Sequence, residues 1–175
     1  RGMGKQGSGQ TQLANSSAWE FDYPLHKCNT KMNSAGSYLF YHYDSLLHFH
    51  DTQIARKASE GGPDTGQDLT KYVNYAALGK AILFSNPPEA VASYVPEKLR
   101  MQHSGAMQSV VLIDEIDKAP RDFPNDILAE TEEFFFDVRE TGWQIRANRD
   151  LAPIGSFTSN QARNLPRAFS PLCSF

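Results

Sequence analysis

The chain has 175 residues, of which 40% are hydrophobic and 21% are charged, and its formal net charge is −3. This length suits one folded domain over residues 1–175, and the scattered basic residues argue against a nucleic-acid binder, which needs a concentrated basic face. The sequence shows no apolar run of about 18 residues and no secretory leader pattern. Its two cysteines cannot form a disulfide framework. We therefore expect a cytoplasmic protein that binds neither a membrane nor nucleic acid.

The first half of the chain is predicted to be mostly helical. Residues 11–20 have the composition of a short helix, and residues 23–30 are typical of a short strand. Apolar residues recur at helical spacing over 37–57 and again over 69–84. Glycine, proline and aspartate make 58–68 a loop. Residues 85–108 contain three prolines and are expected to be an irregular insertion.

The second half has the pattern of an α/β protein. Val110–Ile113 are four consecutive aliphatic residues, which is typical of a strand covered on both faces in a parallel sheet. Residues 123–134 read as a helix, 134–148 as a hairpin of two aromatic-rich strands, and 151–160 as a further strand. Strands that alternate with helices predict an α/β fold with a mainly parallel sheet flanked by helices.

The opening stretch resembles a phosphate-binding loop. Glycines allow successive backbone N–H groups to point at an anion where a helix begins. Residues 4–11 match the pattern G-x-x-x-x-G-K-[ST] except at the lysine position, which holds Gln10. A flexible glycine-rich tail is the alternative interpretation. The candidate phosphate-binding residues are Gly4, Gly7, Ser8, Gly9, Gln10, Thr11 and Gln12.

Two acidic residues follow the aliphatic strand and are candidates for a magnesium-nucleotide site. Asp114 would hold Mg²⁺ through water, because that ion keeps much of its hydration shell. Glu115 would act as general base on the attacking water. Asn160, at the tip of the expected strand beside Asp114, could orient that water. The alternative is that these residues have no catalytic role. Asp114 and Glu115 would then be two acids at the exposed end of a buried strand, and Asn160 would belong to a polar turn at a strand end.

Three segments resemble the MoxR branch of the AAA+ ATPases. They are "YLFYHYDSLLHFHD", "VVLIDEIDKAPRDFPNDIL" and "FTSNQARNLPRAF". The resemblance implies a P-loop ATPase core that binds ATP and Mg²⁺, assembles into homo-oligomeric rings, often hexamers, and remodels a protein partner, commonly one of von Willebrand A type. It places Thr11 and Asp114 on magnesium, Glu115 in hydrolysis, and Asn160 as the first sensor.

The chain departs from the family at positions that serve hydrolysis. Gln10 brings no charge to the phosphates, and charge-assisted hydrogen bonds are about twice as strong as neutral ones. Pro171 and Leu172 stand where the family has two arginines that would reach a neighbouring subunit, a contribution of about 10³-fold or more in studied cases. We therefore expect hydrolysis to be impaired more than binding.

Other departures concern the framework. Ala162 replaces a usual glutamate, and Gly155 and Ser156 stand where a buried strand would carry two β-branched residues. The family's first strand and its small helical lid are absent from the sequence. We expect the chain to be a piece of a larger protein, or one altered by design or reconstruction.

Some residues suggest weaker alternatives. His42, His48, His50 and Asp51 lie close together, but histidines on such a helix are more often packing or surface residues than metal ligands. Cys28 is expected to be an inert, buried thiol, and Phe134–Phe136 to pack a hairpin rather than stack bases.

Two classes of function follow. The first is an ATP-binding module that couples hydrolysis to remodelling of a protein, with weak or absent turnover in this chain. The second is a non-hydrolysing structural or interaction module derived from the same fold. A metal-dependent hydrolase built on the histidine helix is a distant third.

Overall fold

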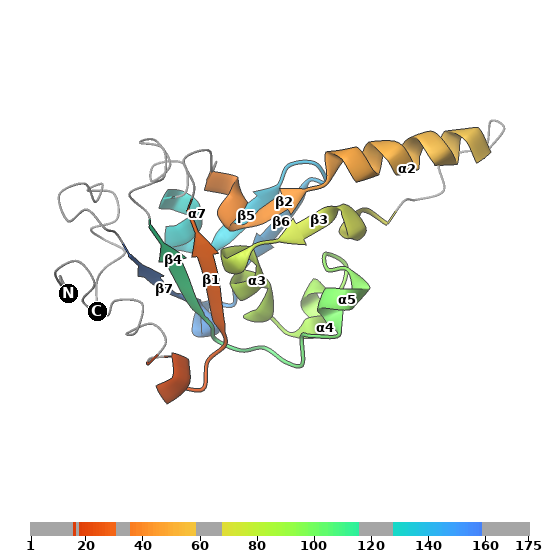
Figure 1. Ribbon diagram of the computed structural model, residues 1–175. Coiled ribbons are helices and arrows are strands. Elements are labelled where there is room, and N and C mark those ends of the chain that lie inside the picture. Colours follow the sequence, from red (N-terminus) through yellow and green to blue (C-terminus); the bar gives the residue numbers. More distant parts are fainter. Residues whose placement is uncertain (1–15, 17, 31–35, 59–67, 116–127, 159–175) are drawn as a thin grey trace.

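The computed structural model describes residues 16, 18–30, 36–58, 68–115 and 128–158, and Figure 1 draws the remaining ones as a grey trace. The strands in this part are β1 (Leu25–Asn29), β2 (Tyr41–Tyr43), β3 (Val73–Tyr75), β4 (Val110–Asp114), β5 (Phe135–Val138), β6 (Trp143–Arg146) and β7 (Ile154–Phe157). The helices are α2 (Ser45–Ala58), α3 (Ala77–Phe84), α4 (Pro88–Val91), α5 (Glu97–Arg100), α7 (Leu128–Glu133) and the 3-10 turns η1 (Gly36–Leu39), η2 (Leu69–Tyr72) and η4 (Arg149–Leu151). Within the described ranges, no helix has both the length and the apolar character needed to cross a bilayer.

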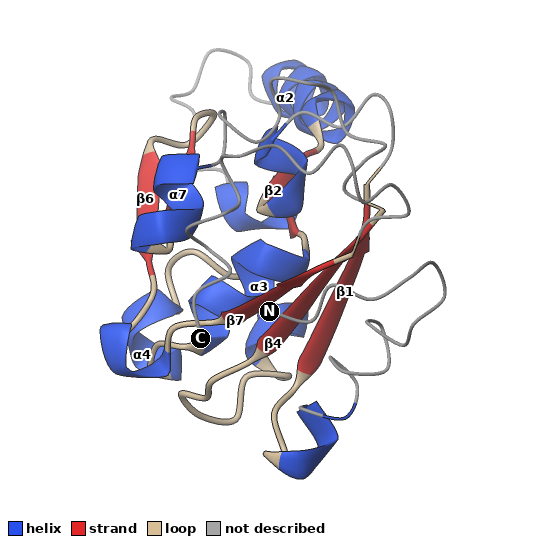
Figure 2. Ribbon diagram, turned by 90° about the vertical axis from the view of Figure 1, so that its left-hand side faces the viewer, coloured by secondary structure: helices blue, strands red, loops and turns tan. Residues whose placement is uncertain are grey.

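A three-stranded parallel sheet, flanked by helices, forms the centre of the fold (Figures 1 and 2). The strand order is β1-β4-β7, with Asn29 paired to Asp114 and Val110 paired to Ile154. The predicted α/β class and the three strands of this sheet are therefore confirmed. Because all three strands are parallel, the residues that follow them meet at one edge of the sheet.

The middle strand β4 is covered on both faces, as its aliphatic run predicts. Val111 and Ile113 belong to the main hydrophobic core, together with the apolar side chains of α3. Val110 and Leu112 point to the other face, where Ala18 packs against them from the helical turn before β1. Burial on both faces fixes the strand, so its end is held in a defined place.

Aromatic side chains join the remaining two strand pairs. The strands β2 and β3 form one antiparallel pair, and β5 and β6 form the predicted hairpin. Phe136 of the hairpin is buried and stacks on Phe40, with ring centroids 5.3 Å apart, and on Tyr41. The Tyr41 hydroxyl donates to Glu140 Oε2 at 2.9 Å. Phe136 therefore packs the core, as expected.

Two segments predicted as single helices contain a strand each. Residues 37–57 form η1, β2 and α2, and residues 69–84 form η2, β3 and α3. In β2 the outer residues Tyr41 and Tyr43 are buried and the residue between them is exposed, and β3 has the same alternation. Aromatic and apolar residues at every second position favour a strand. Together with the neighbouring apolar residues they also happen to show the spacing of a helix, which misled the prediction.

The segment 85–108, expected to be irregular, contains the short helices α4 and α5. Pro88 occupies the first turn of α4, where the missing N–H costs nothing. Val91, Val95 and Leu99 from this segment are buried in the main core. The prolines therefore start helical turns here.

The position of β7 in the sheet explains why its sequence can contain two residues that disfavour a buried strand. Among the described strands, β7 pairs only with β4 and so lies at an edge. Gly155 is exposed and Ser156 half-buried, so neither has to fill a packed layer. A glycine and a serine cost less there than in a central strand.

Candidate functional site

The carboxyl edge of the parallel sheet brings together three segments that are far apart in the sequence. Thr30 follows β1, Asp114 ends β4, and Thr158 follows β7. The backbone continues the ladder here, because Thr30 N donates to Asp114 O at 3.1 Å and Thr158 N donates to Ile113 O at 2.9 Å. Ligands of open α/β sheets bind outside this edge. The edge is therefore the candidate site.

One oxygen of Asp114 is held by two donors. The hydroxyl of Thr158 and the backbone N–H of Glu115 both donate to Asp114 Oδ1, the second at 3.0 Å. The carboxylate is half-buried, and no contact within the described residues engages its other oxygen, Oδ2. Such an arrangement orients the carboxylate.

The backbone at Glu115 turns sharply and is tied to the neighbouring strand. Glu115 has φ of 57°, in the left-handed region that non-glycine residues seldom adopt. The hydroxyl of Thr30, which is buried, lies 2.6 Å from both Asp114 O and Glu115 O and can donate to either. Glu115 N also lies 3.2 Å from Thr158 Oγ1. These bonds stabilise a conformation that lifts Glu115 out of the strand, and strained residues of this kind occur at functional sites.

The donor set of this edge fits a hydrated magnesium ion. Mg²⁺ takes one or two carboxylates and completes its shell with water and substrate phosphates. A half-buried carboxylate with one oxygen fixed matches that need. Over the described residues, no group of three histidine, cysteine or acidic side chains gathers to enclose a metal ion.

Several predicted site residues lie outside the described residues. The whole candidate phosphate loop falls there, as do Asn160 and the departures at Ala162, Pro171 and Leu172. Their placement beside Asp114 stays a prediction. The residues of the loop in question are Gly4, Gly7, Ser8, Gly9, Gln10, Thr11 and Gln12.

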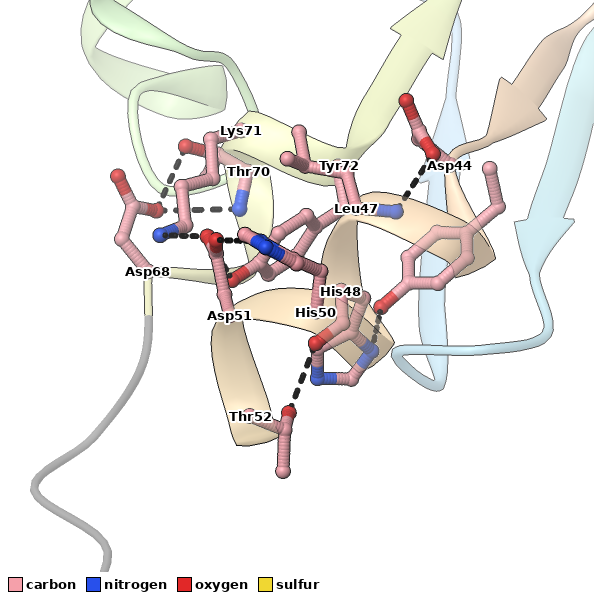
Figure 3. A network of polar contacts seen from close by, with 11 residues as sticks. Asp44, Leu47, His48, His50, Asp51, Thr52, Asp68, Thr70, Lys71 and Tyr72 are labelled. Carbon is pink, nitrogen blue, oxygen red and sulfur yellow. Dashed lines mark hydrogen bonds and ion pairs between the residues drawn. The ribbon is translucent and has the colours of Figure 1, made fainter. Parts of the chain in front are cut away.

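The histidine helix α2 makes packing contacts (Figure 3). The His48 Nδ1 atom shares a hydrogen bond of 2.8 Å with the Tyr43 hydroxyl, and the His48 ring stacks on Tyr72 with centroids 4.6 Å apart. Asp51 Oδ2 accepts from Lys71 Nζ at 2.8 Å and from the Tyr72 hydroxyl at 3.0 Å, and these donors hold the pKa of Asp51 below its ordinary value. The two side chains therefore attach α2 to η2.

The lone cysteine of the described residues, Cys28, is half-buried in β1. Burial raises the pKa of its thiol, which lowers the thiolate fraction at neutral pH. Its side chain packs against the main core. This agrees with the expected inert thiol.

Sequence reasoning missed the two threonines that hold the acidic pair. Both were visible as polar residues directly after predicted strands, at the ends of "YPLHKCNT" and within "FTSN". Their role depends on the register of three strands, since Thr30 acts on a backbone 84 residues away in sequence. Only the paired sheet reveals it.

Two comparisons with known proteins identify no relative of this chain. A scan against models of protein families gives no match, and a search among curated proteins gives none either.

Proposed function

We propose that the chain is an ATP-binding module of the MoxR type of AAA+ ATPase, with impaired hydrolysis. Nucleotide phosphates and Mg²⁺ would bind at the carboxyl edge of the parallel sheet. The observation that carries the proposal is the position of Asp114 and Glu115 at the end of the middle strand, with hydrogen bonds to the residues that follow both neighbouring strands.

The fixed carboxylate has the first role. Since Thr158 and the Glu115 N–H hold Asp114 Oδ1, the second oxygen would accept hydrogen bonds from the water of a magnesium ion. Mg²⁺, when bound, would neutralise charge on the phosphates. Thr11 would contribute a hydroxyl to the same ion, and the loop amides from Gly4 to Gln12 would cradle the phosphates.

Glu115 has the second role. Its left-handed backbone separates its side chain from the strand ladder, and the hydroxyl of Thr30 fixes that turn. Glu115 would accept the proton of an attacking water that Asn160 orients. Gln10 supplies no charge to the leaving phosphates, so we expect the proton transfer to be rarely completed.

Assembly and partners belong to the same proposal. The family resemblance favours a homo-oligomeric ring, often a hexamer, and a protein partner, with a von Willebrand A-type domain as the first candidate. Pro171 and Leu172 replace the arginines that would act across such a ring, which is a second reason to expect little turnover.

Calorimetric titration with Mg-ATP, alongside an assay for released phosphate, tests this function. The expected result is binding without release. Brisk release would contradict the interpretation of Gln10. Absence of binding would favour the alternative, a purely structural or interaction module of the same fold.

The variant Gln10→Lys sharpens that test. Restoring the charge should tighten Mg-ATP binding by about tenfold, since charge-assisted hydrogen bonds are the stronger kind. Hydrolysis should stay low, because the arginines are still missing. If Gln10→Lys binds Mg-ATP no more tightly than the parent chain, the loop is not organised around phosphate.

A further inference from the structure

The opposite edge of the parallel sheet carries a pocket, which the proposed nucleotide site does not use. The pocket has a volume of about 610 Å³, within the range of ligand sites. All of its lining residues precede a strand of the sheet: four lead into β1, two lead into β4 and one leads into β7. They are Phe21, Asp22, Tyr23, Pro24, Met107, Gln108 and Leu151.

An alternation of aromatic and acidic residues leads into this pocket, and its last three members line it. The sequence from 19 to 23 reads WEFDY and forms the turn at the foot of β1 (Figure 1). Trp19 is 87% exposed and Phe21 is 58% exposed, although both are large and apolar. The rings of Phe21 and Tyr23 stack with centroids 5.7 Å apart. Aromatic faces open to solvent at a pocket rim are typical of a binding surface.

The charge of the pocket is negative. Asp22 is the only charged residue in its lining, and Glu20 is exposed two residues before it. No contact within the described residues neutralises the Asp22 carboxylate. A carboxylate in the same lining as aromatic side chains attracts a cation in two ways, through its own charge and through the negative faces of the rings.

The turn that presents these groups is fixed. Ala18 is buried against the sheet, and Tyr23 N donates to Ala18 O at 2.8 Å, which closes the turn. Asp22 has φ of 54°, a conformation that aspartate and asparagine tolerate better than most residues. The aromatic rings and the carboxylate are therefore presented by an ordered backbone.

We propose that this pocket binds an arginine side chain on the surface of a protein partner. A guanidinium group is planar, stacks on aromatic faces and sheds water more easily than an ammonium group. It also donates in several directions, which suits the Asp22 carboxylate and the amide oxygen of Gln108, whose Nε2 already donates to Ala152 O at 2.8 Å. The proposal is independent of the nucleotide site, which lies at the other edge of the sheet.

The test is an NMR titration of the whole chain with a glycine pentapeptide that carries one central arginine. Matched peptides carry citrulline, which has the same shape without the charge, or lysine. We expect the arginine peptide to shift the amide signals of Phe21 and Tyr23, and the citrulline peptide to bind at least tenfold more weakly. Equal shifts from the citrulline peptide would overturn the proposal, and equal affinity of the lysine peptide would overturn the choice of guanidinium.

Variants locate the binding. Asp22→Asn keeps the turn and should weaken arginine-peptide binding about tenfold, and Phe21→Leu should weaken it roughly two- to fivefold through loss of the ring face. Asp137→Asn, which removes an exposed carboxylate from β5, should bind like the parent chain. An unchanged affinity in Asp22→Asn, with a folded spectrum, would contradict the proposal.

Discussion

The hydroxyl of Thr158 donates a hydrogen bond to Asp114 Oδ1, which links the residue after β7 to the last residue of β4. The same hydroxyl oxygen lies 3.2 Å from Glu115 N. Thr158 is buried, so water cannot replace it easily. One side chain therefore connects two strand ends and both acidic residues of the candidate site.

Replacement of this hydroxyl by a methyl group should destabilise the chain. In Thr158→Val the Asp114 carboxylate and the Glu115 N–H each lose one of two partners and keep the bond to each other, and the loss of a hydrogen bond to a charged group costs about 1.5–3 kcal/mol. Urea denaturation at neutral pH measures the free energy of unfolding. Thr158→Ser keeps the hydroxyl and should unfold nearer to the parent chain. If the valine variant is as stable as the serine variant, the hydroxyl does not hold the pair.

A half-buried histidine should make stability depend on pH. Burial, and then the charge of Lys80, lower the pKa of His26 from its ordinary value of 6.5. At pH values between the lowered pKa and 6.5, His26 is therefore protonated in the unfolded chain and neutral in the folded chain. Across that window the contribution of His26 to stability should rise with pH.

The variant His26→Leu isolates this effect. Its free energy of unfolding, followed by urea titration at a series of pH values, should rise less steeply with pH than that of the parent chain. His42→Gln removes an exposed histidine of β2 and serves as the control for the loss of a histidine. Parallel slopes for the parent and His26→Leu would contradict the assignment.

A glycine in α3 allows the helix to approach the chain before β2. A Cβ atom at Gly79 would collide with the backbone carbonyl of Phe40, which cannot move like a flexible side chain. We expect Gly79→Ala to lower the free energy of unfolding by roughly 1–3 kcal/mol or more. Gly105→Ala is the matched control, since nothing lies within 4 Å of a Cβ there. Equal thermal midpoints for the two variants would contradict this packing.

The attachment of α2 should depend on one carboxylate. In Asp51→Asn the hydrogen bonds from Lys71 and Tyr72 lose their charged acceptor. We expect faster amide hydrogen exchange across α2, with little change in the exchange of β4. His50→Gln alters the neighbouring side chain, which lies 3.7 Å from Asp51 Oδ1 and is largely exposed, and should leave α2 protected. If both variants exchange alike, Asp51 does not anchor the helix.

The elements that could be predicted from the sequence are those in which the apolar residues follow one clear spacing. The aliphatic run of β4 has no polar residue to suggest another structure, and the hairpin β5–β6 carries a turn between two aromatic-rich runs. The strands β2 and β3 were missed because their alternating buried residues, two tyrosines in β2 and a valine and a tyrosine in β3, continue into apolar residues at helical spacing. Three-residue strands are also too short to outweigh their flanks.

The candidate site was predicted only in part. Asp114 and Glu115 follow a buried strand, so chemistry at that end could be inferred from the sequence. The roles of Thr30 and Thr158 depend on which strands are neighbours and in what register. The pocket at the opposite edge of the sheet is formed by three segments that are distant in the sequence, so no local sequence pattern could predict it.

The most direct measurement of the central claim is calorimetric titration of Mg-ATP into the parent chain and into Asp114→Asn. If Asp114 helps to hold the magnesium of a nucleotide, the parent chain binds Mg-ATP, and the variant, or the parent chain with excess chelator, binds at least tenfold more weakly. Asp137→Asn should bind like the parent. Binding of equal affinity in the parent chain and in Asp114→Asn, or no binding by the parent chain, would contradict the account.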